Sequence, residues 1–171
     1  MDHQLGTTQA ELPAKPASFN HTYAAFIQHD ANGAPIGADP QGLSYLTWGG
    51  TTDALTGLIF RSNGSIVGYG AAPTAQVSRV GVFQAVPAGT LDPFFGNNGV
   101  ATYGVEVQAY SLQNSIVEQP DGKFVTLSMS ALSTYQARVL RFSNNGTLDT
   151  GFGNQTLPDL KGAPVQLLMD S

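Results

Sequence analysis

The chain has 171 residues, 42% of them hydrophobic, which is enough for one domain with a substantial core. Only 11% of its residues are charged and its net charge is −5, so its seven scattered basic residues cannot form the positive stripe that nucleic-acid binding requires. It has no cysteine, no basic amphipathic stretch and no long apolar run, and we therefore expect no disulfides, no thiolate metal site and no membrane insertion.

Residues 1–18 are polar and include two prolines, which predicts an extended N-terminal arm without the apolar segment of a signal peptide. From residue 19 onward, short runs rich in Val, Ile, Thr, Tyr and Phe alternate with clusters of Gly, Asn, Asp and Pro. This alternation is typical of strands joined by turns, and almost no stretch has helical periodicity. The sequence therefore predicts a single all-β domain over residues 19–171.

Two β-hairpins are predicted within this domain by their turn sequences. Asn63-Gly64 lies between apolar runs in residues 58–69, and Asp121-Gly122 lies between apolar runs in residues 116–127. Both dipeptides favour the positive φ values that a tight hairpin turn requires. A hairpin of two antiparallel strands is therefore expected at each site.

A further strand is expected after each hairpin, at residues 78–83 and at residues 137–142. Aligning the two strands by their shared Arg-Val step pairs Arg79 with Arg138. In this alignment the first copy has two extra residues before the turn that follows. The two arginines are therefore expected to occupy equivalent places.

The same turn sequence closes both copies. Residues 91–96, with the sequence LDPFFG, return at residues 148–153 as LDTGFG, and a Gly-Thr pair precedes each of them. Gly33, Gly89 and Gly146 are 56 and 57 residues apart. A repeat at this period indicates stacked supersecondary units, as in propellers or solenoids.

The repeat divides the domain into four parts. They are a partial unit at residues 19–37, full units at residues 43–96 and 100–153, and a C-terminal segment at residues 154–171. The C-terminal segment contains an apolar run that fits either the first strand of a further unit or a tail that docks on the sheet. The chain therefore holds about two and a half units.

The second unit resembles the delta-60 repeat family, which is known from bacterial proteins that carry long arrays of such units. The matching residues are Asp121-Gly122-Lys123, Arg138, Phe142, Asn145 to Asp149, and Phe152-Gly153. In the first unit Asn63-Gly64-Ser65 replaces the Asp-Gly-Lys turn, and the resemblance extends over roughly residues 22–157. The resemblance implies four-stranded, antiparallel, propeller-like blades and implies no activity. About two and a half blades are too few to close a ring of roughly four to eight.

The recurring polar residues have two readings each. Asp92 and Asp149 are expected to accept backbone N–H bonds in the turn, and a metal site is the alternative. Arg79 and Arg138 are expected to pack on a neighbouring blade, and binding of a carboxylate or a sugar is the alternative. Gly96 and Gly153 complete the turn beside Phe95 and Phe152, which are expected to plug the core. The list of structural turn residues is Asp92, Asp149, Gly96, Gly153, Arg79 and Arg138.

Three aromatic residues are candidates for stacking on a sugar ring, namely Trp48, Tyr45 and Tyr103, although each also fits an ordinary core position. The three histidines all precede residue 30, and the chain has no nucleophile-elbow motif. We therefore expect no catalytic residues, no metal and no cofactor.

The expected function is that of a non-catalytic structural or interaction module in an exposed assembly, such as a cell-surface protein, an extracellular filament or a virion. The low charge and the incomplete repeat count motivate this reading. Self-association is expected through residues 19–37 and 158–171, because incomplete units leave strand edges and apolar faces open. The alternative is a carbohydrate-binding propeller that several chains assemble, with a glycan as its partner.

Overall fold

The computed structural model describes residues 24–37, 40–49, 52–72, 79–104, 115–129, 136–152 and 155–161. This part of the chain is all-β, as predicted, and it contains no helix of the length and apolarity needed to cross a bilayer. Its strands are β1 (Ala24–Ile27), β2 (Leu43–Leu46), β3 (Ala54–Phe60), β4 (Ile66–Ala71), β5 (Val80–Ala85), β6 (Val100–Tyr103), β7 (Ser115–Glu118), β8 (Phe124–Met129), β9 (Gln136–Phe142) and β10 (Gln155–Lys161).

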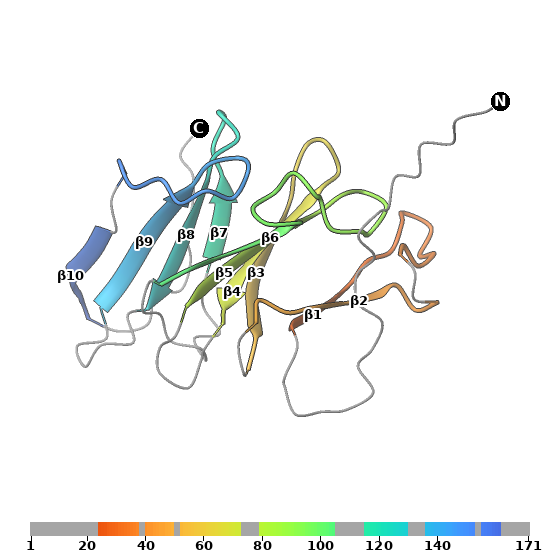
Figure 1. Cartoon of the computed structure of the whole chain (residues 1–171), viewed down its shortest axis with the longest axis horizontal. Helices are drawn as coiled ribbons and strands as arrows, with labels where there is room; N and C mark the ends of the chain where they lie inside the picture. The colour runs from red at the N-terminus through yellow and green to blue at the C-terminus, as the bar shows by residue number, and fades with distance from the viewer. Residues whose placement is uncertain are drawn as a thin grey trace.

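The strands form three antiparallel sheets that follow one another along the chain. The two-stranded sheet pairs β1 with β2, the first four-stranded sheet has the order β3-β4-β5-β6, and the second has the order β7-β8-β9-β10. Each four-stranded sheet is a simple meander in which consecutive strands are neighbours. The sheets lie side by side in chain order, with the two-stranded sheet at one end and the second four-stranded sheet at the other (Figure 1).

Both predicted hairpins are confirmed. β3 pairs with β4 across the Asn63-Gly64 turn, and β7 pairs with β8 across the Asp121-Gly122 turn. Gly64 and Gly122 have φ values of +79° and +80°, which side-chain-bearing residues rarely adopt. The Asn63 and Asp121 side chains accept the backbone N–H two residues later, at 3.0 Å and 3.1 Å. The turn chemistry therefore explains where both hairpins reverse.

The sheets do not begin where the sequence units begin. Residues 43–46, expected to open the first unit, form β2 and pair with β1. Residues 100–103, expected to open the second unit, form β6 and pair with β5. The last strand of each of these two sheets therefore belongs to the sequence unit that forms the next sheet. Each full unit thus contributes strands to two consecutive sheets.

The strand register differs from the alignment that paired Arg79 with Arg138. Ile66 lies opposite Ala85 and Phe124 lies opposite Phe142, so Gln84 and Arg141 occupy equivalent places, 57 residues apart. Arg79 precedes β5, whereas Arg138 lies inside β9. The alignment was wrong because it matched the Arg-Val dipeptides and so placed two extra residues between the strand and the turn of the first unit. The strand pairing shows that this connection has the same length in both units, since Ala85 and Phe142 are equivalent and each precedes the Leu-Asp pair by six residues.

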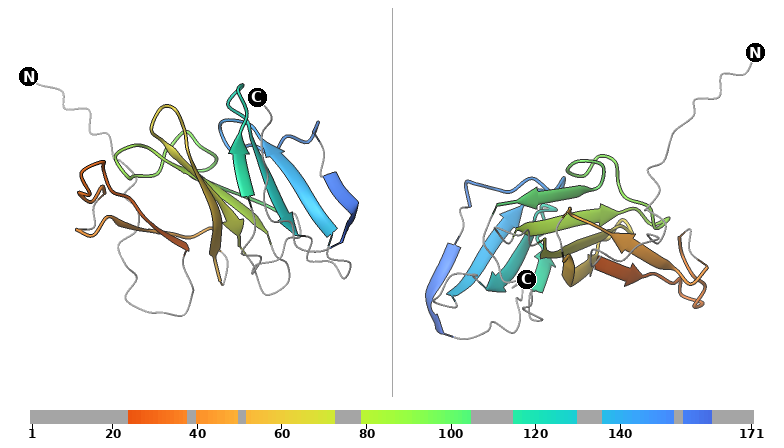
Figure 2. Two further views of the ribbon diagram at one scale, coloured as in Figure 1. Left: turned by 180° about the vertical axis from the view of Figure 1, so that it is seen from behind. Right: turned by 60° about the horizontal axis from the view of Figure 1, so that its bottom comes forward.

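The core consists of two clusters, one on each face of the first four-stranded sheet. The cluster toward the second four-stranded sheet contains Val67, Tyr69, Phe95, Phe124 and Phe142 among others. The other cluster lies toward the two-stranded sheet and has Phe26, Leu46, Trp48, Ile66 and Phe83 among its members. Views from behind and from below show the first four-stranded sheet between its two neighbours (Figure 2).

Glycines in the first four-stranded sheet make room for its large aromatic side chains. The Phe83 ring lies where a Cβ on Gly68 would be, and the Trp48 ring lies where a Cβ on Gly81 would be. Trp48 and Phe83 are themselves in contact, with ring centroids 6.3 Å apart. Trp48, which follows β2, therefore packs directly on the backbone of β4 and β5 at Gly70 and Gly81.

Gly81→Ala should destabilise the fold by about 1–3 kcal/mol, because the new methyl group overlaps the buried Trp48 ring. Gly104→Ala is the matched control, since a Cβ there meets no atom within 4 Å. Urea unfolding of both variants measures the difference. Equal unfolding free energies for the two variants would show that Trp48 does not pack on β5.

Candidate functional site: the junctions between sheets

Five turns in the described ranges have a residue that donates its N–H to the carbonyl four residues later, and three of them add a second backbone bond that spans eight residues. These second bonds run from Ile36 N–H to Gln28 O at 2.9 Å, from Asp92 N–H to Gln84 O at 2.9 Å, and from Asp149 N–H to Arg141 O at 2.8 Å. The strands before these three turns are β1, β5 and β9. The β1–β2 pair is therefore the counterpart of β5–β6 and β9–β10, and the described two-stranded sheet lacks counterparts of β3 and β4.

Asp92 and Asp149 both lie in the turn that follows this pattern. Asp149 Oδ1 accepts the N–H groups of Gly151 and Phe152 at 3.1 Å and 3.2 Å, and Asp92 Oδ1 accepts the N–H of Phe94 at 2.9 Å. The second carboxylate oxygen, Oδ2, accepts a hydrogen bond from a side chain of the preceding strand. This geometry is that of a turn-stabilising aspartate.

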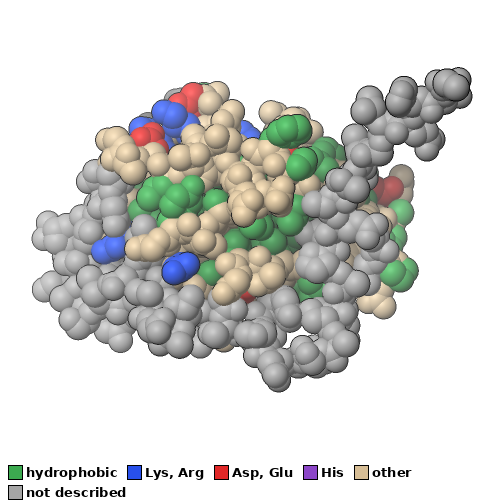
Figure 3. Space-filling view, viewed as in Figure 1, with side chains coloured by type: hydrophobic (Ala, Val, Ile, Leu, Met, Phe, Trp, Pro, Cys, Tyr) green, Lys and Arg blue, Asp and Glu red, His purple; other side chains and the backbone are tan. Residues whose placement is uncertain are grey.

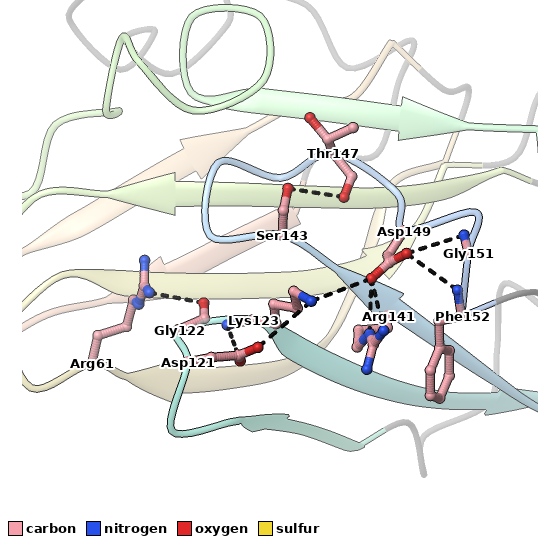
Figure 4. A network of polar contacts seen from close by, with 10 residues as sticks. All are labelled: Arg61, Asp121, Gly122, Lys123, Arg141, Ser143, Thr147, Asp149, Gly151 and Phe152. Atoms are coloured by element: carbon pink, nitrogen blue, oxygen red, sulfur yellow. Dashed lines mark hydrogen bonds and ion pairs between the residues drawn. The ribbon is translucent and has the colours of Figure 1, made fainter.

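The residue that faces the turn aspartate differs between the sheets. In the second four-stranded sheet Arg141 Nη2 lies 2.9 Å from Asp149 Oδ2, and Lys123 Nζ lies 3.7 Å from the same oxygen (Figure 4). In the first, Gln84 Nε2 donates to Asp92 Oδ2 at 2.5 Å. Charged side chains of both signs gather over the turn end of the second four-stranded sheet (Figure 3).

The environment of Asp149 favours its ionised form. The Phe152 N–H bond makes the largest contribution to lowering the pKa of this carboxyl, and the neighbouring Arg141 and Lys123 lower it further. Arg141 also stacks over the Phe152 ring, with its Cζ 4.4 Å from the ring centroid. The turn, the cation and the aromatic ring therefore form one unit.

Asp149→Asn should remove a pH-dependent part of the stability. Because the folded-state pKa is lowered, the carboxylate stabilises the fold fully above the usual carboxyl pKa of about 3.9, and this stabilisation is lost as pH falls through the lower folded-state value. The unfolding free energies of wild type and variant should therefore differ most near neutral pH and converge in acid. Denaturant unfolding from pH 7 down to pH 2 measures this, and a constant difference would contradict it.

Phe95 is the central contact between the two four-stranded sheets. Its side chain is 1% exposed and stacks on Phe124 of the second sheet, with ring centroids 6.2 Å apart. A Cβ on Gly146 would lie 2.6 Å from the Phe95 ring, so only glycine allows this approach. Gly96 N–H donates to Asn145 O at 2.8 Å, and Tyr103 Oη donates to Gly146 O at 2.7 Å. One turn of the first sheet is thus seated on the corresponding turn of the second.

Arg61 makes a second contact between these sheets. It follows β3, and its side chain is 11% exposed. Its guanidinium donates to Glu118 at the end of β7 at 2.7 Å, and to Gly122 O at 3.1 Å. Within its own sheet it donates to Gln84 Oε1 at 2.8 Å. Sequence reasoning missed this residue, because Arg61 has no recurring counterpart: the equivalent position holds Gln119.

Phe95→Ala should destabilise the chain by about 3–5 kcal/mol, because it leaves a cavity between two buried aromatic surfaces. The adjacent Phe94 is 90% exposed, so Phe94→Ala should change the stability by less than about 0.5 kcal/mol. Thermal and denaturant unfolding of this pair measure the junction directly. A small effect of Phe95→Ala would show that the two sheets are stable without each other.

Of the remaining predicted turn residues, Arg79 lies apart from this junction, Arg138 and Gly96 lie at it, and Gly153 is not among the described residues. Arg79 is exposed, and its backbone pairs with Ala72. Arg138 lies on the face of β9 that looks toward the first four-stranded sheet, opposite Ser128. Gly96 has a φ of +55° in the turn, and Gly153 falls outside the described residues.

Two of the three sugar-stacking candidates come together. Trp48 and Tyr103 line one hollow of about 500 Å³ along β6, together with Asn97, Thr102 and Thr147. Trp48 is nevertheless only 8% exposed, and its Nε1 has no hydrogen-bond partner among the described residues.

Tyr45 is not part of this hollow. It lies opposite Ala25, on the face of β2 that is turned away from the buried Leu46. The structure therefore brings Trp48 and Tyr103 together at one hollow and leaves Tyr45 outside it.

No group of three His, Cys, Asp or Glu side chains in the described ranges is arranged to hold a metal ion. Comparison with family models, with curated proteins and with solved structures found no match to this chain.

Proposed function

We propose that this chain is a non-catalytic structural or interaction module, built from β-propeller-like units that associate through the same contacts that join its own sheets. The observation that carries the proposal is the directional junction at Phe95, where a turn of one sheet is seated on Gly146 of the next. Contacts of this head-to-tail kind extend by adding units, and they either close into a ring or form a filament.

The open end of this array is the two-stranded sheet. Leu58 and Phe60 on β3 are 40% and 72% exposed, and Ile27 on β1 is 62% exposed. At the opposite end Val125, Leu127 and Ala137 face away from the first four-stranded sheet and are buried, at 7% exposure or less. Exposed apolar surface of this kind marks an interaction site. Of the two predicted contact segments, residues 19–37 include β1, which lies at this open end.

The low charge and the acidic balance suit an exposed assembly, on a cell surface, in an extracellular filament or on a virion. The resemblance to the delta-60 repeat family supports the same role, because those units are expected to form propeller-like blades in long arrays. The two and a half units of this sequence would not close a ring by themselves, since a ring takes roughly four to eight blades.

A carbohydrate-binding propeller is the second candidate, and the shared hollow of Trp48 and Tyr103 favours it. Aromatic side chains beside amide and hydroxyl groups are suited to sugar rings. Trp48 is the only tryptophan of the chain, so its fluorescence reports directly on this hollow. A saturable change in that fluorescence on glycan titration would distinguish a lectin from a scaffold.

Light scattering at micromolar concentration should give a mass well above the 17.9 kDa of one chain. Association is expected because Phe60 and Ile27 expose apolar area that a partner would bury. Phe60→Ser should shift the distribution toward the single chain, whereas Phe94→Ser serves as the control at an exposed phenylalanine elsewhere. A stable single chain at all concentrations would contradict self-association.

A further inference from the structure

β3 has two faces, and β7 of the second four-stranded sheet covers only one of them. Ile59 lies opposite Val67, which belongs to the core shared with the second four-stranded sheet, where β7 lies against β3. Leu58 and Phe60 lie opposite Gly68 and Ile66, so they share the other face, toward the two-stranded sheet. Seen from behind, β3 lies between β7 on one side and the two-stranded sheet on the other (Figure 2).

The two-stranded sheet leaves part of this second face uncovered. β1 lies against β3, and Phe26 of β1 stacks on Phe83 of β5 with ring centroids 5.2 Å apart, but Leu58 and Phe60 remain 40% and 72% exposed. The places above β3 and β4 are those that a preceding hairpin would take. The exposed side chains Leu58 and Phe60 lie in that place.

The edge of β1 that borders this place has backbone groups directed toward it. Gln28 N–H donates to Gly42 O at 3.0 Å, on the β2 side. Backbone N–H groups alternate along a strand, so the N–H groups of Ala25 and Ile27 are directed to the opposite edge. Among the described strands, β1 pairs only with β2. Main-chain donors and an apolar surface therefore meet at one location.

We propose that the edge of β1 and the Leu58–Phe60 face together form a docking site for a β-hairpin supplied in trans, one strand of which pairs with β1. The inference rests on the interaction function proposed above and specifies its surface and the form of its partner. An incoming strand of this kind gains main-chain hydrogen bonds from the sheet edge and specificity from its alternate side chains.

The chemistry of the site indicates what the hairpin presents. At the junction between the four-stranded sheets, the last residue of β7 is Glu118, which binds Arg61 of the sheet before it. The equivalent last residue of β3 is Phe60. The docked hairpin should therefore place an apolar side chain opposite Phe60, where the internal junction uses an arginine.

The test uses the full chain and a synthetic peptide of residues 54–71, which is the sequence of the β3–β4 hairpin and presents Ile59, Val67 and Tyr69 on one face. Fluorescence anisotropy of the labelled peptide should show saturable binding. Leu58→Ser combined with Phe60→Ser should weaken binding roughly tenfold or more, because two apolar contacts are lost. Phe94→Ser, at a 90% exposed site elsewhere, should leave binding unchanged.

Hydrogen exchange locates the bound peptide. The amides of Ala25 and Ile27 should exchange fast in the chain alone and become protected when the peptide is present. Equal binding by the doubly substituted chain, protection of these amides without peptide, or the absence of saturable binding would each overturn the docking site. If light scattering shows a monomer and the peptide still binds, the docking site is supported and self-association is rejected. If the chain still self-associates after the double substitution and the peptide does not bind, the docking site alone is rejected.

Discussion

Each sheet of this chain is a single layer, so an apolar face is buried only where a neighbouring sheet or turn covers it. The first four-stranded sheet is covered on both faces, since Val67 and Tyr69 are buried on one face and Ile66 and Phe83 on the other. Phe95 contributes to this burial, because its ring lies on Gly146 and stacks on Phe124 of the next sheet. The glycine-containing turns and the aromatic residues therefore depend on one another across sheet boundaries.

The directional character of these junctions connects the fold with the proposed function. A turn of one sheet rests on the turn of the next, so the contact between successive sheets is asymmetric and has no self-complementary partner surface. Such a contact adds units in one direction, and the exposed Phe60 lies at the end where a preceding unit would be. Glu118 at the end of β7 and Phe60 at the end of β3 would give the internal contact and the proposed contact with a partner different chemistry.

The turns could be predicted from the sequence because they depend on local chemistry, whereas the pairing between distant strands could not be predicted. Asn63-Gly64 and Asp121-Gly122 specify their hairpins because few residues other than glycine adopt the required positive φ. The residue at which each sheet begins could not be predicted, because it depends on whether residues 100–103 pair with β5, which precedes them, or with β7, which follows them. The alignment of Arg79 with Arg138 failed for the same reason, since residue identity does not determine register.

We infer that the two four-stranded sheets stabilise each other as one cooperative unit. Native-state hydrogen exchange on the chain with Phe95→Ala separates this from two independent sheets, because β4 and β8 lie at the centres of the two sheets. The amides of Val67 in β4 and of Leu127 in β8 should lose protection together and by a similar factor. Loss of protection in one sheet, with the other unchanged, would show that the sheets are independent.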